Sequence, residues 1–228
     1  MRGGIAVVIP AFNECESIPA VVARVPETVC GLQTVVLVVD DGSSDGTADA
    51  AASANAAVAR HLVNQGGGAA LRTGYAVAHD AGAALVVTMD ADGQHLPEEM
   101  SRLVEPILAD EADVVIGSRT LGSADPNTFA RELGLRVFNQ VLSIATRMPI
   151  TDCSSGYKAV RADALGRLDL RQDQFHASEF LIESAKRGLR VQEAPITIAA
   201  RTHGVTKKPT TLRYGLGFAN AIVRTWLR

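Results

Sequence analysis

Hydrophobic residues in the first half of the chain form short continuous runs instead of falling at every second position. The runs are rich in Val, Ile and Leu and lie at residues 5–10, 35–40, 57–63, 85–90 and 114–118. Strands that are apolar at successive positions are typical of a sheet covered on both faces. The pattern therefore predicts five strands of a buried sheet.

Alanine-rich segments separate these strands. They lie at residues 17–25, 47–53, 69–81 and 97–109 and are predicted to be helices. Strands that alternate with helices indicate an α/β fold, and ligands bind such sheets at the carboxyl ends of the strands. We therefore predict a mostly parallel central sheet flanked by helices, with its functional site at that edge.

The pattern changes after Arg119. A loop is expected at residues 120–128, followed by an amphipathic helix at 131–148. The residues predicted to share the apolar face of this helix are Leu133, Val137, Val141, Leu142 and Ala145. A polar turn follows at 151–157, then a helix at 177–187 that ends before Gly188, and a late strand at 191–199.

The last segment, residues 210–228, is also predicted to be an amphipathic helix. The residues near its apolar side are Leu212, Leu216, Ala219, Val223 and Trp226. Arg213, Arg224 and Arg228 are available to anionic lipid headgroups. This tail is therefore a candidate for membrane contact.

The composition is that of one globular domain without a broad basic surface. With 228 residues, 47% of them hydrophobic, the chain can bury one substantial core, and we predict a single domain over residues 1–228. Lys and Arg total 22 against 25 Asp and Glu, and the net charge of −3 argues against nucleic acid as a partner. Any anion site must therefore be local.

Cysteine usage and hydropathy indicate the compartment. Cys15, Cys30 and Cys153 are odd in number and contain no CxxC pair, which argues against disulfides and zinc and favours a reducing cytoplasm. Strand-like sequence starts at residue 5, which leaves no room for a signal peptide, and no run approaches the roughly 18 apolar residues of a membrane span. We expect a protein that is soluble or peripheral on the inner face of the membrane.

Two carboxylates and an amide follow the fourth predicted strand. Asp90, Asp92 and Gln94 lie within five residues, directly after the apolar run that ends at Met89. Hard cations such as Mg²⁺ and Mn²⁺ prefer oxygen ligands, and Mg²⁺ is usually shared between carboxylates and the phosphates of a substrate. The cluster therefore predicts a metal site that holds a diphosphate.

Polar clusters also end two other strands, at residues 10–14 and 40–46. The second cluster, which continues to Thr47, is either a ribose or base contact or a turn leading into a helix that Asp45 or Thr47 caps, and both interpretations can hold together. Because parallel strands share one carboxyl edge, one crevice can gather all three clusters.

Other candidate residues favour structural roles. The glycines at 66–68 lack the third glycine of a dinucleotide fingerprint and a Walker lysine, so we predict a tight turn before a helix whose small residues let the backbone approach a nucleotide. His61 and His79 are interpreted as surface or packing residues, whereas His95 and His176 stay open candidates. Cys153 has no paired base, so a nucleophilic role is not expected.

In combination, the motifs resemble the family 2 glycosyltransferases and, within them, the polyprenyl-phosphate (dolichyl-phosphate) mannose synthases. The resemblance spans almost the whole chain. It rests on the segments at residues 9–14, 38–47, 89–95, 116–119 and 152–157. It implies the GT-A nucleotide-diphospho-sugar fold, a Rossmann-like domain with a nucleotide-sugar half at residues 1–119 and an acceptor half at residues 120–228.

The resemblance also implies roles for individual residues. The donor base and ribose are assigned to Pro10, Phe12, Glu14, Val39 and Asp41. The metal and donor diphosphate are assigned to Asp90, Asp92 and Gln94, with Ala91 beside them. The acceptor phosphate is assigned to Arg119 and Arg131, with Ser155 and Gly156 in the acceptor site, and Arg119, Arg201 and Lys207 are also expected to contact the donor.

Departures from the family pattern affect the expected donor and the membrane anchor. Phe12 stands where tyrosine is common, and His203 and Thr206 stand where arginine and serine are usual. GDP-mannose is the favoured donor, with UDP-glucose or another UDP-sugar as the alternative. Many relatives carry C-terminal membrane helices that are absent here, so membrane contact is expected through amphipathic surfaces or a partner protein.

The chemistry of the acceptor separates the possible reactions. A lipid phosphomonoester is mostly a dianion at neutral pH and attacks without a general base, whereas a sugar hydroxyl needs one. No convincing acid-base pair is present, which favours a polyprenyl phosphate, and the resemblance implies inversion at the anomeric carbon. The alternative is a hydroxyl acceptor of a polysaccharide or secondary metabolite, with Glu179 or Asp152 as the base.

Two further classes are weighed against a transferase. A sugar-1-phosphate nucleotidyltransferase would need a glycine-rich loop after the first strand, where residues 10–14 read Pro-Ala-Phe-Asn-Glu. A non-catalytic nucleotide-binding module stays open, and hydrolysis of a donor in the presence of metal would exclude it.

Overall fold

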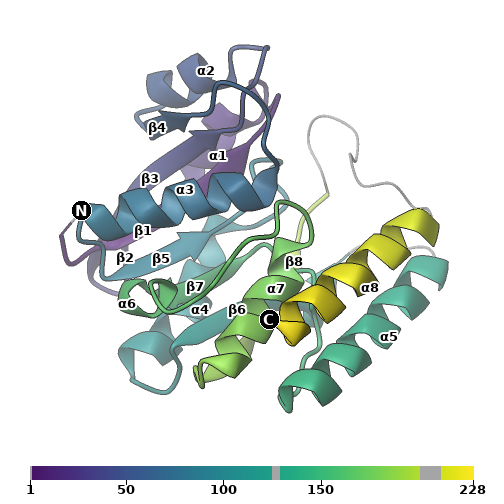
Figure 1. Cartoon of the computed structure of the whole chain (residues 1–228). Coiled ribbons are helices and arrows are strands. Elements are labelled where there is room, and N and C mark those ends of the chain that lie inside the picture. The colour runs from purple at the N-terminus through teal and green to yellow at the C-terminus, as the bar shows by residue number, and fades with distance from the viewer. Residues whose placement is uncertain (1, 125–128, 201–211) are drawn as a thin grey trace.

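A mixed sheet with helices on both faces forms the body of the molecule (Figure 1). The computed structural model describes residues 2–124, 129–200 and 212–228, with side chains at 2–123, 134–200 and 217–228. The strands are β1 (Ile5–Ala11), β2 (Thr28–Val29), β3 (Leu32–Asp40), β4 (Ala57–Arg60), β5 (Leu85–Thr88), β6 (Val114–Ala124), β7 (Lys158–Arg161) and β8 (Val191–Ile198).

The sheet is parallel except at β2 and β7. Its order is β2-β3-β1-β5-β7-β6-β8, and β4 pairs with β3 beside that path. The pairs β1–β3, β1–β5, β3–β4 and β6–β8 are parallel, whereas β7 is antiparallel to both β5 and β6. The prediction of a mostly parallel sheet is therefore confirmed. The boundary between the two expected halves, after residue 119, falls inside β6, so both halves contribute to one sheet.

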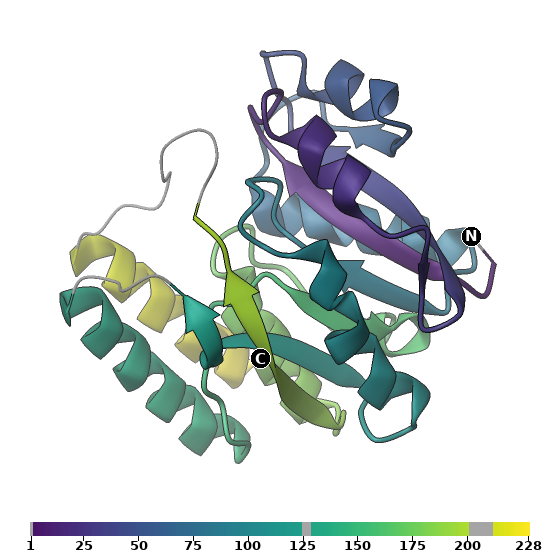
Figure 2. The same ribbon diagram turned by 180° about the vertical axis from the view of Figure 1, so that it is seen from behind.

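Helices cover the two faces of the sheet and build a separate core on each. They are α1 (Ile18–Arg24), α2 (Thr47–Ser53), α3 (Gly67–Asp80), α4 (Met100–Leu108), α5 (Phe129–Thr146), α6 (Ala162–Leu165), α7 (His176–Lys186) and α8 (Leu212–Leu227), and a 3-10 turn at Pro97–Glu99 precedes α4. Helices α3 and α7 lie on the face seen in Figure 1, and α1 and α4 cover the opposite face (Figure 2).

Helices α5 and α8 lie side by side at one end of the sheet, next to α7 (Figure 1). The rings of Phe138 and Phe218 join them, with centroids 4.5 Å apart. The residues predicted to share the apolar face of α5 differ in burial: Leu142 is buried, whereas Val137 and Val141 are exposed. Periodicity placed these residues on one side, but the helix packs through only part of that side. No helix in the described ranges has the length and apolarity to cross a bilayer.

The sequence prediction missed β2, β7 and α6. Strand β7 is only four residues long, begins with Lys158 and ends with Arg161, and follows a polar turn, so it lacks the apolar run that identified the other strands. It is a strand because the edges of β5 and β6 hold it on both sides.

The glycines at 66–68 are close to another part of the chain. Helix α3 begins at Gly67, which confirms the predicted turn before a helix. A Cβ atom at Gly68 would lie 1.9 Å from Gln172 O, and the N–H of Gly68 donates to Asp173 O at 2.9 Å. The close protein neighbour of Gly68 is therefore the segment before α7, and the approach of a nucleotide to this turn stays a prediction.

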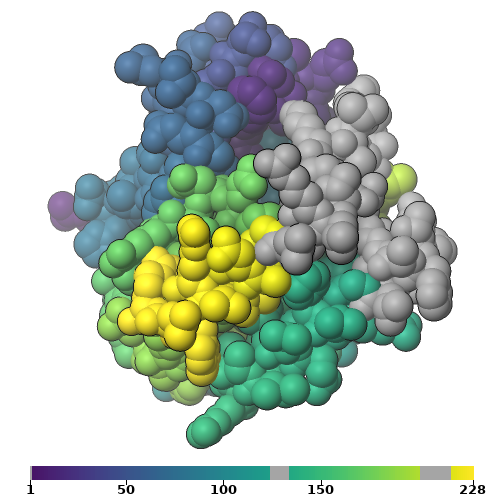
Figure 3. Space-filling view, turned by 45° about the vertical axis from the view of Figure 1, so that its right-hand side comes forward, coloured from purple at the N-terminus to yellow at the C-terminus, as the bar shows by residue number. Residues whose placement is uncertain are grey.

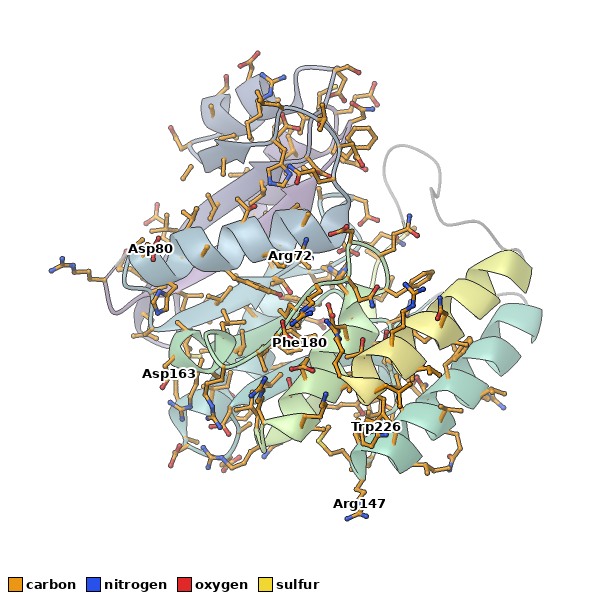
Figure 4. The ribbon with its side chains drawn as sticks, viewed as in Figure 1. Arg72, Asp80, Arg147, Asp163, Phe180 and Trp226 are labelled. Carbon is orange, nitrogen blue, oxygen red and sulfur yellow. The ribbon has the colours of Figure 1, made fainter. Side chains whose placement is uncertain are left out.

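Lys158 on β7 is buried between the sheet and α7. Its Nζ atom lies 4.9 Å from the centre of the Phe180 ring and has no hydrogen-bond partner in the described part of the chain. Figure 4 shows Phe180 between α3 and the helices below it. Burial lowers the pKa of Lys158 to about 8, although the negative charge of Asp90 opposes the shift. The charged ammonium group is therefore costly in this position.

We predict that Lys158→Met increases the free energy of unfolding at pH 7, by about 2 kcal/mol. Because the folded pKa lies below the unfolded value of about 10.4, the cost of the buried charge is fully present below pH 8 and is relieved as the pH rises toward 10. Denaturant unfolding at several pH values should therefore show the advantage of the variant narrowing between pH 8 and 10. A constant difference would contradict the assigned cost.

Candidate active site

Two of the three predicted polar clusters meet through direct hydrogen bonds. The loops after β1 and β3 leave neighbouring parallel strands and run side by side. The N–H of Asn13 donates to Ser43 Oγ at 2.9 Å, and the N–H of Glu14 donates to Thr47 Oγ1 at 2.9 Å. The two loops therefore form one wall at the carboxyl edge of the sheet.

Asp45 ties this wall to the start of α2. Its carboxylate accepts from the N–H of Thr47 at 3.1 Å and from the N–H of Cys15 at 3.1 Å. Burial alone would raise the pKa of Asp45, but these hydrogen bonds outweigh it and lower the pKa to about 2. The interpretation of this segment as a turn leading into a helix is therefore confirmed.

Asp41, an expected donor contact, organises the loop before α3. Its carboxylate accepts from the N–H groups of Gln65 and Gly66 at 2.9 and 2.8 Å, and His61 Nδ1 lies 2.7 Å from it. The other ring nitrogen of His61 is 2.9 Å from Thr73 Oγ1. His61 is therefore a bridge between this loop and α3, a role that its isolated position in the sequence did not indicate.

The remaining donor candidates differ in accessibility. Pro10, Phe12 and Glu14 are partly exposed at the sheet edge, and Glu14 Oε2 accepts from Ser17 Oγ at 2.9 Å. The side chain of Val39 is fully buried and packs beneath α3, where a Cβ at Gly74 would lie 3.3 Å from it. Pro10, Phe12 and Glu14 thus present surface at this edge, and Val39 supports it from below.

The acidic cluster follows β5 directly. Asp92 Oδ1 accepts from the N–H of Gln94 at 3.1 Å, and Gln94 Nε2 donates to Ala199 O at 3.2 Å. His95 Nδ1 accepts from the N–H of Asp90 at 3.0 Å, and its ring stacks on Tyr157 with centroids 4.9 Å apart. His95 therefore shapes the loop that carries Asp90 and Asp92, and Ala91 is buried within it.

The absence of a side chain at Gly156 leaves room for the carboxylate of Asp90. A Cβ at Gly156 would lie 2.6 Å from Asp90 Oδ1, so any other residue would displace the carboxylate or the strand. Two carboxylates and an amide oxygen form the donor set that a hard divalent cation takes. In the described residues no three His, Cys, Asp or Glu side chains gather as a metal cage.

Arg119, the expected acceptor contact, is held by the turn before β7. Its Nε and Nη2 atoms donate to the two oxygens of Asp152 at 2.7 and 2.8 Å, and Nη2 also donates to Ser154 Oγ. Burial alone would lower the pKa of Arg119, but the hydrogen bond and the negative charge of Asp152 raise this pKa above its usual value. The guanidinium is thus fixed in orientation, and Nη1 has no recorded partner among the described residues.

The other acceptor candidates lie beside this pair or outside the described side chains. Ser155 is buried, with its Oγ atom 3.4 Å from Tyr157 O, and Gly156 O accepts from Thr88 Oγ1 at 2.6 Å. Arg131 lies in α5, but its side chain is not described. Arg201 and Lys207 lie outside the described residues.

Both carboxylates considered as a general base have structural partners. Glu179 is buried and accepts from the N–H groups of Arg171 and Gln172 at 3.0 and 2.8 Å, and it is ion-paired with Arg228. Asp152 is occupied by Arg119 as described. Cys153, the residue after Asp152, is buried, and burial and the charge of Asp152 raise the pKa of its thiol to about 12.

Sequence reasoning missed three residues that support the site. Lys158 is a buried cation that interacts with Asp90, and Glu193 and Asn139 hold the turn that carries Asp152. Their residue types gave no signal, since each acts on a segment that is distant in the sequence.

Comparison with known proteins agrees with this geometry. The model of the family described as glycosyl transferase family 2 matches residues 6–169. The chain is 38% identical over 213 residues to the polyprenol monophosphomannose synthase of Mycolicibacterium smegmatis, which covers 88% of this chain and 79% of that protein. It is 34% identical over 211 residues to the undecaprenyl-phosphate mannosyltransferase of Micrococcus luteus, covering 88% and 85%.

The fold is also similar to a solved structure. Glucosyl-3-phosphoglycerate synthase from Mycobacterium tuberculosis, crystallised with Mn²⁺, UDP and glucosyl-3-phosphoglycerate, superimposes with a TM-score of 0.75 at 21% identity, covering 99% of this chain and 79% of that one. The expected GT-A architecture is therefore confirmed. The chain belongs to glycosyl transferase family 2 and is a glycosyltransferase.

Proposed function

We propose that this enzyme transfers a hexose from a nucleotide-diphosphate sugar to a polyprenyl phosphate with inversion. The observation that carries the proposal is the fixed Arg119 beside the acidic cluster, together with the occupation of both candidate bases. Relatives named as polyprenol and undecaprenyl-phosphate mannosyltransferases support the same acceptor class. GDP-mannose is the favoured donor, and a UDP-sugar is the alternative.

The residues at the tip of β5 fit a divalent cation. Asp90, Asp92 and Gln94 would hold Mg²⁺ or Mn²⁺, which when bound would neutralise the charge that grows on the departing nucleoside diphosphate. The wall formed by the loops after β1 and β3, with Phe12 and Glu14, would hold the base and ribose. Arg201 and Lys207 are proposed to contact the donor diphosphate, as the family resemblance implies.

The acceptor phosphate would meet a guanidinium that is already oriented. Arg119 uses two nitrogens for Asp152, which leaves Nη1 to donate to a phosphate oxygen. A phosphomonoester dianion needs no proton acceptor, so the buried states of Glu179 and Asp152 do not hinder the reaction. We assign Arg131, Ser155 and Gly156 to the same acceptor site. Catalysis would then depend on the orientation of the two substrates and on electrostatic stabilisation of the transition state.

Helices α5 and α8 are proposed to contact the inner face of the membrane. Their exposed apolar residues are Val137, Val141, Ile144, Val223, Trp226 and Leu227. The described parts of the two helices lie next to each other in Figure 3, and Figure 4 shows Arg147 extending from the end of α5. Neither 134–148 nor 217–228 contains an acidic residue, although both contain arginines. Arg228 is ion-paired with Glu179, so Arg136, Arg147 and Arg224 are the exposed charges that these segments offer to anionic lipids beside the apolar residues.

The metal site is tested by thermal shift. Mn²⁺ with GDP or UDP should raise the Tm of the wild type above the value with nucleotide alone, by an amount that grows with the ligand concentration relative to its Kd. Asp92→Ala should remove the metal-dependent part, whereas Asp80→Ala, at an exposed position on α3, should keep it. A metal-dependent shift that survives in Asp92→Ala would reject the assigned site.

The acceptor class is tested at Glu179. Glu179→Gln keeps one acceptor oxygen for the backbone N–H groups, so transfer to polyprenyl phosphate at neutral pH should stay within about tenfold of the wild type. A general base would instead be worth roughly 10²–10⁴-fold. A loss of that size, together with an unchanged Tm and an altered pH profile, would favour a hydroxyl acceptor.

Membrane contact is tested by co-sedimentation with vesicles. Ile144 and Leu227 are 69% and 79% exposed, and replacing both with Ser should weaken binding to phosphatidylglycerol vesicles by about tenfold or more, since burial of each side chain contributes about 1.5–3 kcal/mol. Leu62→Ser is the matched control, because Leu62 is fully exposed but lies in another part of the molecule. Equal binding by all three proteins would refute the assigned face.

A further inference from the structure

The turn that carries Asp152 and Ser154 has no regular structure of its own. Yet these two residues set the orientation of Arg119 through its Nε and Nη2 atoms. The accuracy of phosphate recognition therefore depends on whatever holds the turn. Side chains from three elements do so. On β6, Ser118 Oγ lies 2.6 Å from Thr151 Oγ1, and Thr120 Oγ1 donates to Thr151 O at 2.9 Å. The other supports come from β8 and α5.

The support from β8 is Glu193. Its carboxylate accepts from the N–H of Thr151 at 2.9 Å, from Thr151 Oγ1 at 2.7 Å and from the N–H of Asp152 at 3.1 Å. Glu193 pairs in register with Ile116 of β6, the strand that also carries Arg119. This support therefore belongs to the same rigid sheet as the arginine.

The support from α5 is Asn139. Its Nδ2 atom donates to Thr151 O, and its Oδ1 atom accepts from the N–H of Cys153 at 2.9 Å. The amide thus holds both chain neighbours of Asp152. One turn further along the helix, Ser143 Oγ accepts from the N–H of Ile150 at 3.0 Å. The turn is consequently fastened to α5 as well as to the sheet.

Asn139 lies on the opposite side of α5 from the exposed apolar residues. Each residue advances about 100° around a helix, so Asn139 stands about 160° from both Val137 and Val141. Val137, Val141 and Ile144 face outward on one side while Asn139 reaches the turn on the other. Any displacement of α5 is therefore passed directly to the backbone on either side of Asp152.

We propose that Asn139 is a positioning residue for recognition of the acceptor phosphate. It fastens α5 to the turn so that the Arg119–Asp152 pair keeps the orientation in which Nη1 faces the acceptor. The inference rests on the proposed transfer to a polyprenyl phosphate. It adds that the position of α5 affects the affinity for this acceptor more than the affinity for the donor, because Arg119 is only one of the residues assigned to the donor.

The test compares Asn139→Ala with Gln140→Ala, a change at the neighbouring exposed position of α5. With purified full-length protein, Asn139→Ala should raise KM for undecaprenyl phosphate about tenfold. KM for the sugar nucleotide and the rate of donor hydrolysis without acceptor should change by less than about twofold. Gln140→Ala should match the wild type in all of these measurements.

Asn139→Asp supplies the second variant. A carboxylate still accepts from the N–H of Cys153 but cannot donate to Thr151 O, so KM for the acceptor should lie between those of wild type and Asn139→Ala. An unchanged acceptor KM in both Asn139 variants would overturn the inference. So would a parallel loss in acceptor transfer and donor hydrolysis, or an Asn139→Asp protein as impaired as Asn139→Ala.

Failure of the proposed function would give a different experimental result from failure of the inference about Asn139. A wild-type enzyme that hydrolyses the donor but does not transfer to undecaprenyl phosphate would remove both the proposed function and the inference. A wild-type enzyme that transfers normally, with Asn139 variants that also do, would remove only the inference.

Discussion

Strand β7 lies antiparallel between β5 and β6, and this placement forces the turn before it against the tips of both neighbours. Through this constraint Gly156 meets the carboxylate of Asp90 on one side, and Asp152 meets Arg119 on the other. A parallel strand in the same slot would enter from the opposite end of the sheet and carry its preceding turn away from this edge. The proximity of the candidate metal and acceptor sites thus follows from the direction of one short strand.

The charges around that strand are arranged in pairs that restrict movement. Arg119 is matched by Asp152, and buried Lys158 interacts with Asp90. A guanidinium held by two bonds to one carboxylate loses little freedom when a phosphate arrives, because its orientation is already set. Lys158 Nζ accordingly interacts with Asp90 only through charge, since it makes no hydrogen bond in the described part of the chain, and its lowered pKa is of the kind that clusters at functional sites.

Local patterns in the sequence were sufficient for most strands of the sheet. The five apolar runs identified β1, β3, β4, β5 and β6, and the late strand corresponds to β8. The acidic residues after β5 were visible because polar clusters interrupt those runs. Strand β7 was not predictable in this way, since Lys158 and Arg161 occupy half of it and its partners supply its stability. The neighbours of Gly68 were also hidden, because only the fold brings Gln172 beside it.

The residues that hold the turn carrying Asp152 could not be identified from sequence patterns. Asn139 and Glu193 are ordinary polar residues on a helix and a strand, and their role depends on which distant backbone groups the fold brings within hydrogen-bond distance. Likewise, periodicity grouped Val137 with Leu142, but only the packing of α5 determines which of them meets water. Such distinctions require the arrangement of elements in three dimensions.

The absence of acidic residues from 134–148 and 217–228 gives the molecule an electrical polarity. The chain as a whole carries a net charge of −3, so the residues outside these two segments, which include Glu132 of α5 and the Glu179 that pairs with Arg228, are together more negative than the total. Near any negatively charged surface such a molecule experiences a torque that turns its positive end forward, effective within roughly one Debye length of about 8 Å at physiological salt. Electrostatic attraction would then orient the molecule before any of its apolar side chains contact that surface.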